Sequence, residues 1–251
     1  MTEDRFGRFS RLGFEDFRRM AKDSTLSPTE KVGFPDDYRS GKDAAILDDI
    51  LGKLPDLKDS GKMVLDIGPG CGTLARLLID HCREYQHRLV LVDSEEMLGE
   101  LPDASFIQKV PAYYPECPEL FDRYANGFDC ILSYSVLHYV FAESNIWRFV
   151  DLSLSLLSNG GRMLLGDIPN VSKRKRFFSS KTGIEFHQRF MQTQEKPELR
   201  YNVIEPDTID DAVVLGLVSR ARNQGFDAYV LPQGADLPMA NRREDIVVVK
   251  P

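Results

Sequence analysis

The sequence predicts an α/β fold: a doubly wound, mostly parallel seven-stranded sheet with an antiparallel last strand, preceded by an N-terminal helical cap. Three observations predict it. Short apolar segments alternate with segments of helical periodicity from residue 63 onward, which favours parallel strands with helices on both faces. A turn with glycines at positions 68, 70 and 72 joins the first apolar segment to a helix. The last two apolar segments, 226–231 and 245–249, have no helical pattern between them, so they can pair antiparallel.

Length and composition limit the possible classes of protein. The 251 residues fit one α/β domain with elaborations, and a hydrophobic share of 42% is enough for a core. A formal net charge of −7 disfavours broad nucleic-acid binding. No apolar run approaches the roughly 18 residues of a membrane span, and the charged residues 1–10 show no signal-peptide core, so we expect a cytoplasmic protein. The four cysteines lack the paired spacing of zinc sites, which favours free thiols and no metal site.

Residues 1–60 are expected to form the helical cap. Apolar residues recur at helical spacing over 9–21 and 44–54, and Ser27-Pro28 suits a helix start. Residues 33–41 indicate an ordered loop. Two interpretations stay open: a cap packed on the core, or a lid that closes over a ligand with the substrate-binding residues Tyr38 and Arg39 at its tip.

The first strand and the turn after it predict a ligand site. Met63–Ile67 is apolar enough for a strand buried on both faces, and a helix begins at Thr73. Glycines at 68 and 70 allow close approach to the backbone, beside the N–H groups of a helix N-terminus. An acidic residue inside the strand end, Asp66, is unusual, and it suggests that the ligand also carries a positive group.

The second strand, 87–93, ends in Asp93. A carboxylate one βα unit after a glycine turn can accept hydrogen bonds from ribose hydroxyls. The alternative is a helix N-cap, since Asp93 and Ser94 precede a helical pattern. Both can hold, with Asp93 on the ribose and Ser94 at the cap.

The rest of the chain supplies the other elements. Strands are expected at 105–110, 128–133 and 162–167, and a helix at 142–157 that ends in a left-handed cap at 159–161. A further helix at 207–223, closed by Gly225, precedes the last two strands.

These features resemble the class I S-adenosylmethionine-dependent methyltransferases. The resemblance covers roughly residues 60–251 and rests on residues 64–72, Asp93, 128–140 and 157–162. The main competitor is a nicotinamide dehydrogenase. Its fingerprint needs glycine or alanine where this chain has Thr73, and the chain has no second nucleotide-binding half.

The resemblance implies S-adenosylmethionine (SAM) as cofactor and S-adenosylhomocysteine (SAH) as product. It also implies that Asp66 orients the cofactor's ammonium group, that the backbone of the glycine turn faces its amino acid part, and that Met97 lies against the adenine. The acid that often follows the third strand in this family is absent, since the chain reads Lys109-Val110-Pro111. The implied cofactor-binding set is Asp66, Gly68, Gly70, Asp93, Ser94, Met97, Val110 and Ser133.

Two histidines are candidate general bases for a hydroxyl acceptor. His138 follows the fourth strand, at the side of the sheet where ligands bind in open α/β folds. His187 lies in the expected substrate-binding insertion around 168–206, which elaborates a methyltransferase domain spanning 61–251. For each histidine, the alternative is a residue that only packs. Tyr134 is a candidate for positioning the acceptor.

Four consecutive basic residues, Lys173, Arg174, Lys175 and Arg176, stand out in an acidic chain. They indicate either a solvated helix face or a site for a phosphate or pyrophosphate. The segment 166–180 also weakly resembles methyltransferases of surface-polysaccharide pathways, which implies a nucleotide-activated or lipid-linked sugar as acceptor.

The sequence therefore predicts O-methylation of a small, anionic acceptor, with a sugar preferred. Two alternatives stay open. An RNA-modifying enzyme is favoured by the basic run and disfavoured by the overall acidity and by Ser133-Tyr134-Ser135-Val136, which is not the Pro-Pro-aromatic motif of base-nitrogen methyltransferases. A SAM-binding protein without catalysis is the other. The acceptor atom and the oligomeric state cannot be predicted from the sequence.

Overall fold

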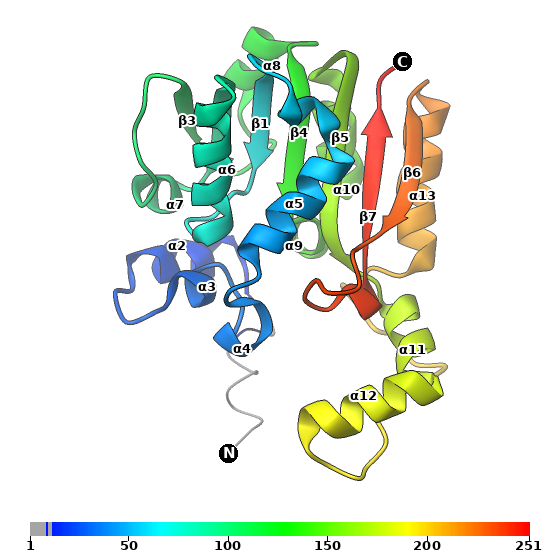
Figure 1. The fold of residues 1–251 in the computed structure, drawn as a ribbon. Helices are drawn as coiled ribbons and strands as arrows, with labels where there is room; N and C mark the ends of the chain where they lie inside the picture. Colours follow the sequence, from blue (N-terminus) through cyan, green and yellow to red (C-terminus); the bar gives the residue numbers. More distant parts are fainter. Residues whose placement is uncertain (1–8, 10–11) are drawn as a thin grey trace.

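A single twisted sheet forms the centre of the molecule (Figure 1). The computed structural model describes residue 9 and residues 12–251. Within these residues, seven strands pair in the order β3-β2-β1-β4-β5-β7-β6. Strands β1 to β5 are parallel, and β7 is antiparallel to both β5 and β6. The predicted fold class is confirmed. The strands are β1 (Met63–Ile67), β2 (Arg88–Asp93), β3 (Ile107–Pro111), β4 (Phe128–Tyr134), β5 (Leu157–Pro169), β6 (Asp227–Pro232) and β7 (Arg243–Val249).

Helices cover both faces of the sheet because each presents one apolar stripe to it. On one face, α5 (Asp43–Lys53), α6 (Thr73–Glu84) and α7 (Glu95–Gly99) bury side chains such as Ile50 and Leu78 in one cluster with the strands. On the other, α8 (Pro118–Tyr124), α10 (Ile146–Ser155) and α13 (Asp211–Asn223) bury Phe149 and Leu217 in a second cluster. The carboxyl ends of the parallel strands stay uncovered by these layers.

The N-terminal segment lies at those carboxyl ends (Figure 1). It contains α2 (Phe14–Lys22), α3 (Pro28–Lys31) and α4 (Asp36–Arg39), followed by α5. Of the helix expected at 9–21, residues 10 and 11 lie outside the described residues, and α2 starts at Phe14. Ser27 caps α3 by accepting a hydrogen bond from the Glu30 N–H at 3.1 Å, as its sequence predicts. The loop expected at 33–41 contains the short helix α4.

The helix expected at 142–157 is present but shorter, over residues 146–155, and a separate helix ends before it. The chain forms α9 (Leu137–Glu143) and α10, because Asn145 interrupts the helix and caps α10 by accepting hydrogen bonds from two N–H groups. The left-handed helix cap expected at 159–161 is wrong, because no helix ends at these residues. Gly160 does have a φ of +77°, but it lies inside β5, where the pairing with β4 shifts register.

Two helices follow β5. They are α11 (Val171–Ser179), capped by Asn170, and α12 (Lys181–Met191), and they extend beyond the carboxyl edge of the sheet (Figure 1). Their aromatic side chains pack together, with the Phe177 and Phe186 rings 5.6 Å apart. No described helix is long and apolar enough to cross a membrane. All four cysteines are buried free thiols.

Candidate active site

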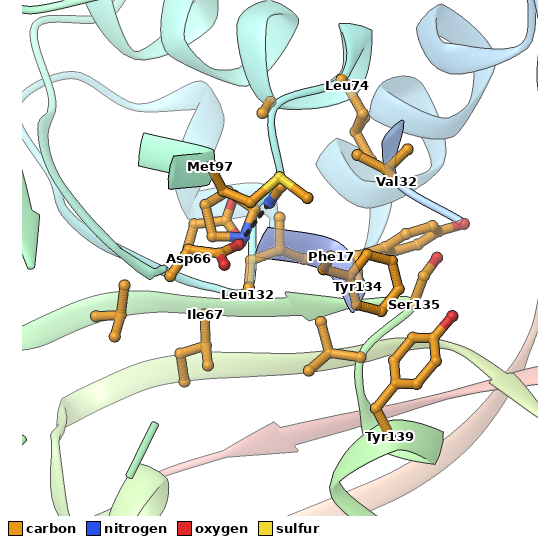
Figure 2. Close-up of a pocket in the computed structure, with 18 of the residues that line it drawn as sticks. Phe17, Val32, Asp66, Ile67, Leu74, Met97, Leu132, Tyr134, Ser135 and Tyr139 are labelled. Carbon is orange, nitrogen blue, oxygen red and sulfur yellow. Dashed lines mark hydrogen bonds between the residues drawn. The ribbon is translucent and has the colours of Figure 1, made fainter. Parts of the chain in front are cut away.

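A large pocket opens at the carboxyl ends of β1, β2 and β4, under the N-terminal segment. Its space, open solvent included, is about 1200 Å³. Figure 2 shows Asp66 and Met97 at one end, and Tyr134, Ser135 and Tyr139 at the other. The two ends of the pocket therefore carry different side chains, an acid at one and hydroxyl-bearing residues at the other.

The glycine turn forms one wall of this pocket. Gly68 and Gly70 have φ values of +72° and +63°, which side-chain-bearing residues rarely adopt. A Cβ on Gly68 would lie 2.6 Å from a methyl group of Val136, and one on Gly70 would lie 2.7 Å from Val32. The turn therefore presents bare backbone to the pocket, and no larger residue fits there.

Asp66 lies at the base of the turn as a buried acid without a partner. Its side chain lines the pocket (Figure 2), the residue is 4% exposed, and it makes no hydrogen bond with any described residue. Burial, and then the charge of Asp93, raise the pKa of Asp66 to about 8. A cationic ligand group would relieve this cost by restoring a partner for the carboxylate.

Asp93 ties the end of β2 to the glycine turn. Its Oδ2 accepts a hydrogen bond from the Gly70 N–H at 2.9 Å, and its Oδ1 accepts one from the Ser94 N–H at 2.7 Å. Burial raises the pKa of Asp93 to about 6, against the lowering effect of these bonds. The cap of α7 is made by Ser94, whose Oγ accepts from the Met97 N–H. Each oxygen of Asp93 keeps a lone pair for a ligand hydroxyl.

The pocket includes some predicted cofactor-binding positions and not others. Asp66, Gly68, Gly70, Asp93 and Met97 line it; Ser94, Val110 and Ser133 do not. At the end of β3, Ala112 and Tyr113 take the place of Val110, and at the end of β4 Leu132 and Tyr134 flank Ser133. The offset is one residue at β4 and two or three residues at β3.

Arg39 reaches the opposite end of the pocket from the N-terminal segment. Its Nη1 donates to Ser135 Oγ at 3.2 Å, and that hydroxyl donates to Asp167 Oδ2 at 2.6 Å. Ser135 directly follows β4, and Asp167 lies near the end of β5. Both have positive φ, +63° for Ser135 and +58° for Asp167. Strained residues of this kind are held in place by their surroundings and cluster at functional sites.

A buried polar network holds Asp167 in this conformation. Arg243 Nη1 donates to the Asp167 carbonyl oxygen at 2.9 Å, and the Asp167 N–H donates to Asp245 Oδ1 at 2.7 Å. Lys53 of α5 completes it with a 2.6 Å bond to Asp245. Hydrogen bonds from three different elements therefore fix the end of β5 beside Ser135.

Neither candidate histidine lines the pocket. The ring of His138 packs against that of Tyr139, its Nδ1 is buried without a partner, and burial lowers its pKa to about 3, with a smaller contribution from Arg243. A group with so low a pKa is a weak base. His187 packs edge-on against Phe178 in the helical insertion. Tyr139 and Glu143, which the sequence did not single out, do line the pocket.

The basic run lies outside the pocket, and most of its charge is engaged. Lys173 donates to the Arg243 carbonyl oxygen at 2.6 Å, while Lys175 and Arg176 form ion pairs with Glu205 and Asp211. The Arg174 guanidinium lies over the Phe178 ring. Tyr38 is also outside the lining and contacts the Phe190 ring, whereas Arg39 and Tyr134 line the pocket. Among the described residues, no group of side chains is arranged to hold a metal ion.

Solved structures of other proteins share this architecture. The chain is similar to the plantazolicin methyltransferase BpumL (TM-score 0.57, 14% identity, covering 99% of this chain and 98% of that one). It is also similar to the N-methyltransferase NodS from Bradyrhizobium japonicum (0.55, 12%, 95% and 98%) and to the CurJ carbon methyltransferase (0.53, 16%, 94% and 64%). No protein-family model and no curated protein matches the sequence.

The fold is therefore the one found in S-adenosylmethionine-dependent methyltransferases, the class that the sequence resembles. At these levels of identity the likeness concerns the fold, and activity must be argued from the site itself. None of the three names a sugar acceptor.

Proposed function

We propose that this protein transfers a methyl group from SAM to a small-molecule acceptor. The observation that carries the proposal is Asp66, a buried acid without a hydrogen-bond partner that faces the pocket beside the glycine turn. Asp93 lies one strand away, joined to the same turn through Gly70. A ligand with an ammonium group and a ribose, the two groups that SAM carries together, would match both acids.

The residues present fit this cofactor. Asp66 would hold the ammonium group, the bare backbone at Gly68 and Gly70 would lie against the amino acid part, Asp93 would accept from the ribose hydroxyls, and Met97 would pack on the adenine. Bound SAM supplies an electrophilic methyl group on a sulfonium sulfur. What this chain must supply is position, because in-line transfer depends on the alignment of the two reactants.

The N-terminal segment would exclude water from the reacting atoms. Phe14, Phe17 and Val32 line the pocket from α2 and the region of α3. The Phe17 ring packs edge-on against Tyr139 of α9 at 5.0 Å, so the segment already contacts the body of the protein across the pocket. This contact favours a cap that encloses the ligands.

Proton removal from a hydroxyl acceptor would fall to a group in the pocket. Glu143 is exposed and lines the pocket next to Tyr139, and its Oε2 accepts only a 3.4 Å bond from the Phe14 N–H. It is a better-placed base than His138 or His187, which do not line the pocket. We therefore assign general-base catalysis to Glu143 for acceptors that lose a proton.

An acceptor with an anionic group remains our preferred substrate class. Oxygen remains the predicted acceptor atom and a nucleotide-activated or lipid-linked sugar the predicted subclass, although the ion pairs of Lys175 and Arg176 leave the sugar pyrophosphate little free charge there. The solved neighbours do not select the atom, because one is named for nitrogen and another for carbon.

Turnover with methyl-labelled SAM tests this proposal against its alternatives. Nucleotide sugars, small phenolic and carboxylic acids, amines and bulk RNA would be offered in parallel. Label transfer to a small molecule supports the proposal. Transfer to RNA alone, with salt-dependent retention of RNA, would support the RNA-modifying alternative. Saturable SAM binding without transfer to any acceptor would support a non-catalytic role.

A further inference from the structure

We propose that Arg174 and Arg242 form a phosphate-binding site beside the pocket, and that they receive a phosphate group carried by the methyl acceptor. This inference rests on the proposed function and names the anionic group of the acceptor. It moves the anion site expected in the basic run away from Lys175 and Arg176, whose charges are paired with acids.

The two arginines meet at one aromatic ring. Arg174 lies on α11, and Arg242 ends the short 3-10 helix η2 (Ala240–Arg242), which lies between β6 and β7 in the chain and packs against α11 (Figure 1). Their guanidinium carbons lie 5.6 and 5.7 Å from the centre of the Phe178 ring. A guanidinium that stacks on an aromatic face is held in orientation and keeps the N–H groups along its edge for a ligand.

Neither guanidinium has a carboxylate partner among the described residues. Arg174 is exposed, and its side chain donates no hydrogen bond to any of them. Arg242 is partly buried and donates only to Asn241, its neighbour in the chain, over 3.4 Å. Asp211, an acid beside α11, is already paired with Arg176. Most N–H donors of the two guanidiniums therefore lack an acceptor from the protein.

Positive charge is concentrated around Arg242. The next residue is Arg243, whose Nε is buried without a hydrogen-bond partner and whose ion pair with Asp167 is 3.2 Å long. Burial lowers the pKa of Arg242 to about 10, and the charges of Arg243 and Arg174 act in the same direction. Tyr38 and Asp167 act against them. An anion bound between the arginines would relieve this repulsion.

A phosphate monoester fits this pair of arginines better than a carboxylate does. It carries a charge of about −1.5 to −2 at pH 7 and several strong acceptor oxygens. It can therefore accept from both guanidiniums at once. A carboxylate carries a single charge and can be satisfied by one guanidinium through a bidentate pair.

Arg243 connects this site to the acceptor end of the pocket. Its guanidinium carbon lies 5.8 Å from the centre of the Phe34 ring, which lines the pocket. Its Nη1 donates to the carbonyl oxygen of Asp167 at 2.9 Å, and the Asp167 carboxylate accepts from Ser135, another lining residue. The phosphate site is therefore separated from the pocket wall by one side chain. We expect a phosphorylated acceptor to bind across it, with its phosphate outside and its reacting group in the pocket.

Calorimetry with phenyl phosphate, benzoate and phenol tests the site directly. These probes share an aromatic ring and differ in their charged group. Each would be titrated at low salt into the protein, with and without saturating SAH. Phenyl phosphate should bind at least about tenfold more tightly than benzoate or phenol, because hydrogen bonds between two charged groups are the strong ones. The double variant Arg174→Gln/Arg242→Gln should lose this preference.

The matched control is Arg200→Gln, which removes the same charge from the exposed segment after α12, where Arg200 pairs with Glu198. It should keep the full preference for phenyl phosphate. Arg242→Lys should keep part of the preference, since the charge remains while the planar fork is lost. Arg174→Gln changes an exposed side chain and should fold normally. This single variant decides the matter if melting temperatures show that the variants of Arg242 have unfolded.

Each outcome supports or overturns the proposal. Loss of the phosphate preference in the arginine variants, but not in Arg200→Gln, supports it. It is overturned if the wild type binds phenyl phosphate no more tightly than benzoate or phenol, or if the control loses as much affinity as the variants.

Binding of single-stranded RNA that depends on both arginines, without binding of phenyl phosphate, would overturn the small-molecule assignment. The titrations without SAH require neither cofactor nor turnover. A wild type that binds phenyl phosphate but no SAH would therefore contradict the proposed function and leave the phosphate site in place.

Discussion

Replacing Asp93 by alanine tests whether this carboxylate binds the ribose of the cofactor. The carboxylate already accepts bonds from the Gly70 and Ser94 N–H groups at 2.9 and 2.7 Å, and we expect its other lone pairs to accept from the two ribose hydroxyls. A hydrogen bond to a charged group contributes about 1.5–3 kcal/mol. Loss of the ribose contacts, with loosening of the turn at Gly70, should therefore cost about 3 kcal/mol of binding free energy, or roughly 100-fold in Kd.

The assay is isothermal titration with SAH at pH 7.5, where Asp93 is ionised because its pKa is about 6. Asp93→Asn is the matched variant, since its amide oxygen can still accept from one N–H group, and about a tenfold loss is expected. A folded Asp93→Ala protein that binds SAH as tightly as wild type would refute the ribose assignment. A melting temperature close to that of the wild type shows that the variant is folded.

Four further predictions follow from the same geometry. The pKa of Asp66 is about 8 in the folded protein, so the folded state keeps a proton that the unfolded chain loses near pH 4. The stability of the unliganded protein should therefore fall as pH rises between these values, by about 1.4 kcal/mol per pH unit. Asp66→Asn should flatten that slope in thermal melts. Gly70→Ala should lose about 1–3 kcal/mol of stability through its positive φ and abolish SAH binding in the titration; normal binding would contradict our account of the turn. His138→Asn should leave the acid side of the pH–rate profile unchanged, because a pKa near 3 lies below the assay range; a shifted profile would restore His138 as the base. Arg176→Gln should change turnover less than about twofold and stability by about 0–1 kcal/mol, because its ion pair with Asp211 is exposed; a large rise in acceptor KM would instead place Arg176 in the acceptor site.

Local sequence patterns predicted most of the fold and one end of the site. The strands are apolar runs, their parallel pairing follows from alternation with helices, and the pair β6–β7 lacks a helix between its strands. The glycine turn, Asp66 and Asp93 could be found because each lies within a few residues of a strand end, where local spacing determines position.

The rest depended on contacts between residues far apart in the chain. Arg39 gains its place from Ser135, 96 residues later, and no local pattern links the two. Ser135 and Asp167 take left-handed conformations that their residue types do not require, because tertiary hydrogen bonds hold them there.

The basic run was also hard to interpret from sequence, because the partners of its charges lie far along the chain. Lys175 and Arg176 suggested an anion site because their partners, Glu205 and Asp211, are 30 and 35 residues further along. Two of the four charges in the run are therefore paired with acids in the fold. Glu143 was overlooked for a related reason, since a single acid in a helix becomes notable only when its helix borders a pocket.

The central claim is that the pocket binds a ligand carrying both an amino acid and a nucleoside. Its most direct measurement is a calorimetric comparison of SAH, methylthioadenosine and NAD on the wild-type protein. We predict saturable SAH binding at one site per chain, weaker binding of methylthioadenosine, which lacks the ammonium group that Asp66 would hold, and no binding of NAD. Equal affinity for SAH and methylthioadenosine, or tighter binding of NAD, would contradict the account.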